Sequence, residues 1–326
     1  METYFKNGLV RDIAYCMDIC ENSDFYIQRL DTGGPEEYSY KSDYLSRRLE
    51  HSIETLYDKF ISILFQDEEQ YYRDVKTLPM FIQAAGLSSD SDCTVDKFND
   101  SLQQGALSVP DIYRHIYAVD CNSLVSTLSN LICEMDSNFM GYYIQLSKID
   151  VNPTGIFLNG TIYTTSFLTR QISALLENYF TKAYSVLDIL TKIAYELQFH
   201  WSDFSTYRKL KSADILFGSK KKLTVNDEPD TIFEKSELIK IVESLRNEVV
   251  HNGSWEPDPK VFIKLLNGDI VEKYMLFPDI EHGRLATSKN RKHFFSKGTK
   301  VNDVFPEIHY AFYSKLLNTV NCLNSQ

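Results

Sequence analysis

Residues 237–255 read ELIKIVESLRNEVVHNGSW. Apolar side chains recur in this stretch at the spacing that places them on one face of a helix. They are Leu238, Ile241, Val242, Leu245 and Val249. Asn252-Gly253 follows, and glycine readily takes the left-handed conformation that ends many helices. The stretch therefore predicts an amphipathic helix that stops at Asn252-Gly253.

Polar side chains near the end of this helix point away from its apolar face. At about 100° per residue, Arg246 lies about 80° from the centre of the face, Asn247 about 180° and His251 about 220°. Arg246 and His251 diverge by about 140° along roughly 7.5 Å of helix. We therefore expect the three to meet a common ligand only in a groove that a neighbouring helix or a second subunit completes.

The pattern Arg246-Asn247-x3-His251 at the end of an amphipathic helix resembles the Arg-x4-6-His motif of the HEPN superfamily. Members of that family are helical bundles of toxin–antitoxin, phage-defence and RNA-processing systems. Many are metal-independent endoribonucleases that place the motif at a dimer interface, and a polar residue often follows the arginine, as Asn247 does here. The resemblance covers residues 119–326, whereas residues 1–118 match no pattern of the family.

The resemblance implies RNA cleavage by the 2′-hydroxyl group, which leaves a 2′,3′-cyclic phosphate. Histidine titrates nearest neutrality, so His251 suits the general acid and base, a role commonly worth ~10²–10⁴ in rate. Arg246 stays charged and offers several donors to phosphate oxygens, while Asn247 is expected to orient a neighbour. A purely structural role is the alternative: arginine and histidine in the last turn of a helix can donate hydrogen bonds to free carbonyl groups and interact favourably with the helix dipole.

Length and composition indicate a folded intracellular protein. The 326 residues allow two modest domains or one elaborated domain, and an apolar content of 43% provides ample core. No apolar run approaches ~18 residues, so we expect no membrane span. The start of the chain lacks a basic region followed by an apolar core, which predicts no signal peptide and a cytoplasmic location.

The six cysteines are scattered without CxxC spacing or paired histidines nearby. Cys16 and Cys20, for example, lie four residues apart in a segment that we interpret as helical. We expect free thiols rather than a metal site or disulfides, and no cofactor.

The net charge of −11 is unevenly distributed along the chain. Residues 1–118 carry a balance of −10, whereas residues 119–326 carry −1. The acidic character therefore belongs to the front of the chain, which we treat as a separate N-terminal helical region of unknown role.

Apolar periodicity predicts a mainly α fold. In the front region it favours helices over 1–30, 42–66 and about 72–85, with a linker or loop over 86–111. In residues 119–326 it favours four helices, and the resemblance implies that they form a HEPN-like four-helix bundle. They span about 119–148, 169–199, 231–252 and 302–323. Asn159-Gly160 and Asn267-Gly268 lie between apolar runs and predict two small β-hairpin insertions over 156–163 and 261–277.

Two further groups of residues are candidates for the site. On the helix over 169–199, Glu177 and Asp188 lie opposite the apolar face, where they either support His251 or form a solvated face. Residues 284–300 hold six cations and no acid, interleaved with aromatic residues, a composition that suits phosphate contact and base stacking. The candidate RNA-binding residues are Arg284, Lys289, Arg291, Lys292, Phe294 and Lys297. Lysine-rich exposed loops also occur for solubility alone.

We therefore expect a metal-independent endoribonuclease of HEPN type that acts on RNA, as a homodimer and in bacterial defence or toxicity, with an antitoxin or other regulatory partner. The alternatives are a non-catalytic HEPN module that binds nucleotides, RNA or a protein, and an adaptor in which residues 1–118 hold the partner.

Overall fold

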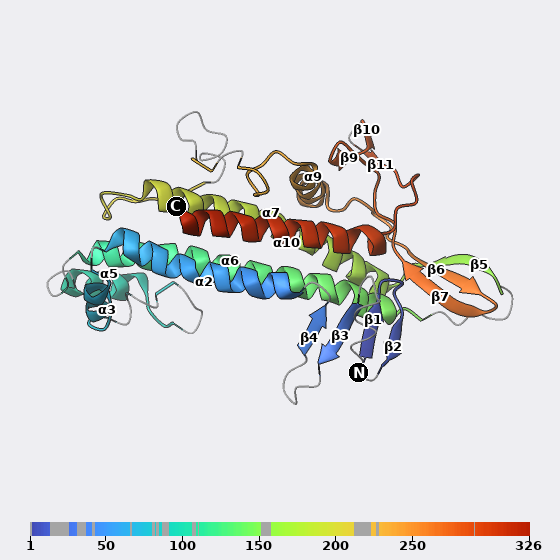
Figure 1. The fold of residues 1–326 in the computed structure, drawn as a ribbon, viewed down its shortest axis with the longest axis horizontal. Helices are drawn as coiled ribbons and strands as arrows, with labels where there is room; N and C mark the ends of the chain where they lie inside the picture. The colour runs from blue at the N-terminus through green and yellow to red at the C-terminus, as the bar shows by residue number, and fades with distance from the viewer. Residues whose placement is uncertain are drawn as a thin grey trace. The chain divides into compact units, whose positions relative to one another are not determined.

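The computed structural model describes most of the chain. The described residues are 2–13, 26–30, 37–40, 43–65, 67–79, 82, 85–86, 91–105, 109, 111–150, 158–211, 223–225, 228–289 and 291–326. Within them the chain forms seven helices and eleven short strands (Figure 1). The prediction of a mainly α protein with small antiparallel sheets is confirmed at this level. None of the described helices combines the length and the apolar character that a membrane span requires.

The chain divides into two compact units, each made of separate segments. The first unit comprises Met1–Leu49, Leu131–Ser185 and Asp227–Asn318, and the second comprises Glu50–Asn130, Val186–Asn226 and Thr319–Gln326. The predicted boundary between residues 118 and 119 falls inside a helix, and both units take residues from each side of it.

Four long helices account for most of the helical residues. They are α2 (Asp43–Leu64), α6 (Ile112–Ser147), α7 (Phe167–Phe199) and α10 (Val301–Ser325). Apolar periodicity predicted all four, although α6 begins earlier than the expected residue 119. Each of these helices contributes residues to both units.

The front of the chain corrects the prediction of a helix over residues 1–30. Strands β1 (Glu2–Phe5), β2 (Val10–Asp12), β3 (Tyr26–Leu30) and β4 (Glu37–Tyr40) form one antiparallel sheet, in the order β2-β1-β3-β4. The predicted N-terminal helical region is therefore helical only from α2 onward.

The physical reason lies in a turn that the helical interpretation overlooked. Asn7-Gly8 connects β1 to β2, and Gly8 has φ 74°, a backbone conformation that favours glycine. Tyrosine, isoleucine and threonine in the flanking segments fit a pleated, half-buried surface, and Ile27 is fully buried there. The predicted stripe positions Cys16, Met17 and Cys20 lie outside the described residues.

The hairpin predicted at Asn267-Gly268 is confirmed. Strands β6 (Val261–Leu266) and β7 (Asp269–Tyr274) pair antiparallel, and both turn residues have positive φ, 52° and 88°. Strand β5 (Gly160–Thr164) pairs with β6, so the sheet has three strands in the order β5-β6-β7. The residues that would form the other strand of the predicted hairpin at Asn159-Gly160 lie mostly outside the described residues.

The core of the first unit is aromatic. Fully buried side chains from α6, α7 and α10 include Phe139, Tyr179, Phe305 and Phe312. Among them lies His309, whose ring stacks on that of Phe139 at 4.0 Å between centroids. The motif helix α9 (Glu237–Asn252) belongs to this unit, and it is seen nearly end-on in Figure 1, where α10 runs across the view.

In the second unit, the structure corrects the predicted helix over 72–85 and the predicted loop over 86–111. Helix α3 covers Glu68–Val75, so it begins and ends earlier than the predicted 72–85. Helix α5 (Val95–Gly105) lies within the segment predicted to be a linker or loop, and its apolar residues Phe98 and Leu102 pack against a small buried cluster around Ile112. Packing against that cluster stabilises a helix whose own sequence is mostly polar.

Candidate functional site

Helix α9 begins and ends by local capping. The side chain of Ser236 accepts a hydrogen bond from the backbone N–H of Ile239, at 3.4 Å. At the other end Gly253, with φ 92°, donates its N–H to the carbonyl of Val249. Val242 and Leu245 of the predicted apolar face are fully buried. The helix ends at the predicted residue but begins at Glu237 rather than at the predicted 231, because Ser236 caps it there, and Val242 and Leu245 of the predicted apolar face are buried in the first unit.

Arg246 is held by two neighbours, neither of them acidic. Its guanidinium carbon lies 4.4 Å from the centroid of the Tyr184 ring, a cation–π distance. Its Nη1 atom donates a hydrogen bond to Oδ1 of Asn247, at 2.9 Å. No carboxylate among the described residues forms an ion pair with it. The guanidinium is thus positioned and half-buried, and no described residue gives it a negative partner.

His251 and Asn247 are exposed on the last turns of α9. Within the described part of the chain, His251 has no hydrogen bond or ion pair. Because Gly253 provides the cap, the structural interpretation that Arg246 and His251 satisfy the last carbonyls finds no support in the contacts. Helix geometry still separates the two side chains by about 140° around the axis.

Glu177 of α7 lies next to the segment that follows α9. Its Oε1 atom accepts a hydrogen bond from Oγ of Ser254, at 2.5 Å. Burial raises the pKa of the Glu177 carboxyl group, and the hydrogen bond from Ser254 opposes that shift. Asp188 lies further along α7 and belongs to the second unit, so it is not assigned to this site.

A cavity of about 320 Å³ opens at the C-terminal end of α9. It contains an acid–base pair that sequence reasoning did not select: Nε2 of His293 lies 3.0 Å from Oε1 of Glu248. Asn252 donates a hydrogen bond to the same oxygen, at 2.9 Å. The Nδ1 atom of His293 is buried without a hydrogen-bond partner in the described residues. Histidine, carboxylate and amide therefore meet at one wall of this cavity.

Glu256 and Arg291 add a second carboxyl group and a guanidinium group to the cavity lining. Trp255 and Phe295 add aromatic surface. Burial raises the pKa of Glu256 to about 7, against the opposing effect of Lys260. A carboxyl group with that pKa exchanges a proton near neutrality. Two signals were available in the sequence: Glu248 and Asn252 share a face of α9 at a spacing of four residues, and His293 interrupts the basic run.

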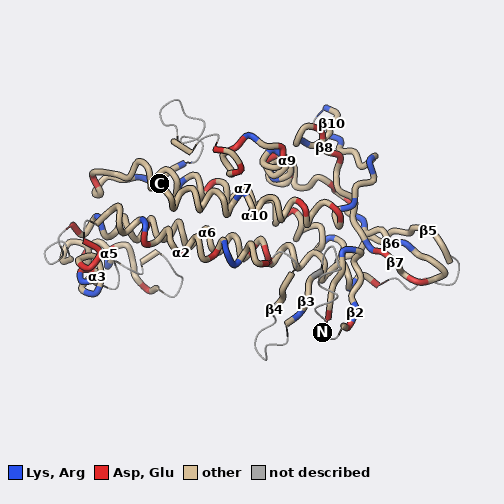
Figure 2. The backbone as a smooth tube through the Cα atoms, in the orientation of Figure 1, with Lys and Arg blue, Asp and Glu red and all other residues tan. Residues whose placement is uncertain are grey.

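The predicted RNA-binding residues belong to the segment that holds β8 (Ile280–Glu281), β9 (Arg284–Leu285), β10 (Thr287–Ser288) and β11 (Lys292–His293). Figure 2 shows basic positions along this segment near α9. Arg284, Lys289, Arg291 and Lys292 are exposed, and Phe294 has 43% of its surface exposed. Lys297 differs, because its Nζ atom donates a hydrogen bond to the carbonyl of Ile280, at 2.8 Å.

This segment docks on α9 through the β8–β9 turn. The backbone N–H of Leu285 donates to Oγ of Ser244, at 3.0 Å. Gly283 has φ 79°, and a Cβ atom there would lie 2.8 Å from the carbonyl oxygen of Glu237. The close approach explains why glycine occupies this position.

The described residues contain no group of three or more histidine, cysteine, aspartate or glutamate side chains that could hold a metal ion. The chain matches no known family model, no curated protein and no solved structure.

Proposed function

We propose that this protein is a metal-independent endoribonuclease of HEPN type, with Arg246, Asn247 and His251 as its catalytic residues. The observation that carries the proposal is the state of Arg246. Its guanidinium is oriented by Tyr184 and Asn247 and has no carboxylate partner in the described structure. A positioned cation without a counter-ion suits a phosphate group, whose oxygens accept charge-assisted hydrogen bonds.

His251 is the proton-transfer group in this proposal. The 2′-hydroxyl of a ribose loses its proton as it attacks the adjacent phosphorus, and the 5′-oxygen of the next nucleotide leaves with a proton. The exposed imidazole of His251 is free to perform one of these transfers. Arg246 stabilises the extra negative charge on the phosphorane, and Asn247 holds the guanidinium at the helix surface.

A second copy of the chain completes the groove. Arg246 and His251 of one helix point about 140° apart, so one phosphate group is reached most directly by side chains from two α9 helices. We therefore propose a homodimer in which the exposed faces of α9 line a shared cleft. The basic segment around Arg284, Arg291 and Lys292 then contacts the RNA backbone on either side.

The decisive experiment is cleavage of total RNA and of a labelled tRNA pool in the presence of EDTA. Wild type is compared with Arg246→Ala and His251→Ala, and with two controls, Arg170→Ala and His51→Ala. Both control residues are exposed. We expect cleavage that survives EDTA, is lost by at least about 10²-fold in both motif variants, and is unchanged in the controls. Cleavage products are expected to end in a 2′,3′-cyclic phosphate.

Two other outcomes carry different conclusions. RNA binding that weakens steeply with salt, without cleavage, would support the non-catalytic binding module. Cleavage that persists in both motif variants would show that the motif is a helix end and that the chemistry lies elsewhere.

A further inference from the structure

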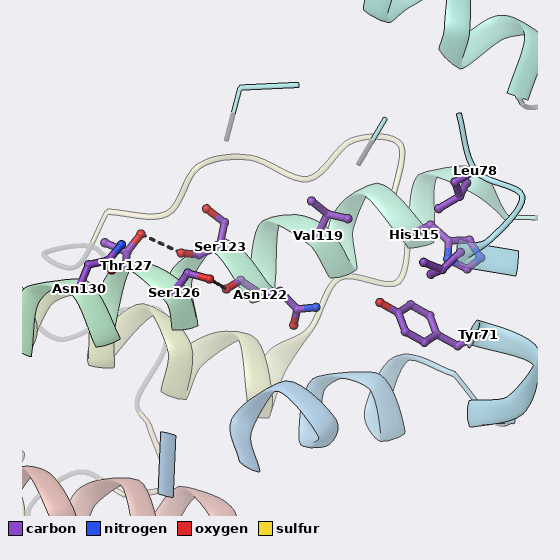
Figure 3. A pocket seen from close by; sticks show the side chains of 10 residues that line it. Tyr71, Leu78, His115, Val119, Asn122, Ser123, Ser126, Thr127 and Asn130 are labelled. Carbon is purple, nitrogen blue, oxygen red and sulfur yellow. Dashed lines mark hydrogen bonds between the residues drawn. The ribbon is translucent and has the colours of Figure 1, made fainter. Parts of the chain in front are cut away.

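The second unit holds a separate cavity of about 400 Å³ beside the first half of α6 (Figure 3). One wall is a polar face of that helix, because residues at spacings of three and four positions lie side by side. It is formed by Asn122, Ser123, Ser126, Thr127 and Asn130. The wall therefore presents hydroxyl and amide groups in a row.

The other end of the cavity is apolar and aromatic. Val75, Leu78 and Val119 line it, together with Tyr71 and His115. The rings of Tyr71 and His115 are stacked, with 5.7 Å between their centroids. Burial lowers the pKa of His115, although Asp74 opposes the shift, so the imidazole is neutral at physiological pH.

Two polar groups of this cavity lack a hydrogen-bond partner among the described residues. The Oδ1 atom of Asn122 is buried and has no hydrogen bond within the described structure. Tyr71 is 9% exposed, and Figure 3 shows its hydroxyl group pointing into the cavity toward Asn122. No described residue accepts or donates a hydrogen bond to that hydroxyl. Buried polar groups are nearly always paired in folded proteins, so the unpaired Asn122 oxygen indicates a ligand that supplies the missing partner, and the Tyr71 hydroxyl is open to the same ligand.

Two of the hydroxyl groups are oriented by their own helix. Oγ of Ser126 donates to the carbonyl of Asn122, at 3.2 Å, and Oγ1 of Thr127 donates to that of Ser123, at 2.7 Å (Figure 3). Oγ of Ser126 also lies 2.9 Å from the Tyr57 hydroxyl, which is the donor of that pair, whereas Oγ1 of Thr127 keeps its lone pairs as acceptors. Together with the amide of Asn122 and the Tyr71 hydroxyl, the wall offers both donors and acceptors.

Charge decides the class of ligand. None of the lining residues that the structure describes is a lysine, arginine, aspartate or glutamate. A phosphate, carboxylate or ammonium group would lose its hydration without gaining a counter-ion there. Neutral hydroxyl groups match the polar wall, and a flat ring matches the apolar end.

We propose that this cavity binds an uncharged small molecule in which a flat ring is joined to a hydroxyl-bearing sugar, the chemistry shared by nucleosides and aryl glycosides. The ring packs against Val75, Leu78 and Val119, and the sugar hydroxyls bond to the wall around Asn122. This site is independent of the proposed ribonuclease activity of α9.

The test is calorimetric titration of the full chain with three probes: adenosine, 4-nitrophenyl β-D-glucoside and adenosine 5′-monophosphate. At least one neutral probe is expected to bind with a Kd of about 1 mM or below. The monophosphate is expected to bind about tenfold or more weakly than adenosine. Binding of adenosine alone would identify a nucleoside site, and binding of the glucoside alone would identify a glycoside site. Absence of binding by both neutral probes would overturn the proposal, as would a monophosphate that binds as well as adenosine.

A pair of variants on α6 ties binding to the cavity. Asn122→Leu is expected to lower the affinity for the neutral probe about tenfold or more. The melting temperature of this variant is expected to equal or exceed that of wild type, because the substitution removes a buried amide oxygen without a described partner. Ser129→Ala, on the same helix outside the cavity lining, is expected to bind as wild type. Ser123→Val provides a second cavity variant if the first one folds poorly. Equal affinity in the cavity variants and in Ser129→Ala would exclude this site.

Discussion

The surroundings of Arg246 show how one aromatic side chain prepares a cation for an anionic ligand. Tyr184 lies under the guanidinium, and Asn247 fixes one of its nitrogens. If Arg246 stabilises the phosphorane, its orientation before RNA binds affects the rate, because a loose side chain must be ordered in the transition state. The role of Tyr184 is therefore a positioning role.

Tyr184→Leu is expected to lower RNA cleavage by roughly 3- to 30-fold, the loss of a cation–π contact worth about 0.5–2 kcal/mol. Tyr163→Leu is the matched control, because Tyr163 faces Lys260 at 5.9 Å on β5, outside the motif. Single-turnover rates at saturating RNA measure the effect. A rate in Tyr184→Leu equal to that of the control would show that the aromatic face does not orient Arg246.

The pKa of Glu256 gives a second prediction at the residue scale. Burial raises this pKa to about 7, above the value of 4.5 for a free glutamate side chain. The folded protein therefore holds this proton at a pH where the unfolded chain has released it. The contribution to stability is complete below about pH 4.5 and is lost as the pH rises through 7.

Glu256→Gln removes this titration, so its stability relative to wild type is expected to increase from pH 5 to pH 8. Urea unfolding at both pH values measures the difference, and Glu281→Gln on the exposed β8 strand serves as the control. A wild-type-like pH dependence in Glu256→Gln would contradict the shift.

At the scale of elements, the β8–β9 turn holds the basic segment against α9. His282 and Gly283 both have positive φ, 52° and 79°, which is the geometry of a two-residue hairpin turn. A Cβ atom at position 283 would lie 2.8 Å from both the carbonyl oxygen of Glu237 and the Cβ of Lys240. Gly298 also has positive φ, 63°, yet it faces open space.

Gly283→Ala and Gly298→Ala separate backbone strain from steric contact. Each substitution places alanine at positive φ, which costs about 1–2 kcal/mol. Gly283→Ala is expected to lower the free energy of unfolding by roughly 1–3 kcal/mol more than Gly298→Ala does, because the turn must move away from α9. Thermal unfolding of both variants checks this, and equal losses would mean that the turn does not press on the helix.

At the scale of the whole molecule, the first unit is held together by a buried polar network inside an aromatic core. His309 of α10 is 2% exposed, and its ring nitrogens lie 3.1 Å from the Tyr179 hydroxyl and 3.0 Å from that of Tyr40. Asp136 of α6 accepts hydrogen bonds from Tyr40, Ser46 and Tyr313. Strand β4 and helices α2, α6, α7 and α10 therefore meet at one network.

This network predicts that acid destabilises the protein. Burial lowers the pKa of His309 from 6.5 to about 3, so the unfolded chain takes up a proton first as the pH falls. Stability is complete above about pH 6.5 and falls toward pH 3, by up to about 1.4 kcal/mol per pH unit. His309→Gln is expected to be less stable at pH 7 but to lose less stability between pH 6 and pH 4. Guanidinium unfolding across that range measures both slopes, with His51→Gln, an exposed position, as the control. Parallel slopes in wild type and His309→Gln would show that another group causes the acid sensitivity.

Short-range signals explain what could be predicted. The motif helix ends at Asn252 because Gly253 follows, and the β6–β7 turn forms at Asn267-Gly268 because both residues accept positive φ. The long helices follow from apolar periodicity over many turns. The helical spacing of residues also predicts that Arg246, Asn247 and His251 lie on the polar face of α9, away from Val242 and Leu245.

Other features depended on residues far apart in the chain. β1 pairs with β3, and Tyr184 comes from α7 to meet Arg246 of α9. The pair of His293 and Glu248 joins a strand to a helix across 45 positions of sequence. Local sequence preferences do not predict such long-range contacts, because a strand or a polar side chain is stabilised by a partner that can lie at any distance in the sequence.

The sequence by itself determined where α9 ends and where the β6–β7 turn forms, since caps and turn residues act within a few positions. It also determined which side chains leave the apolar face of α9. The tertiary structure alone decided that residues 2–5 and 10–12 form strands, and that Arg246 lacks an acidic partner in the described residues. It also decided that a cavity with His293, Glu248 and Glu256 opens beside the motif. These outcomes depend on burial and on long-range pairing, and both arise only once the chain is folded.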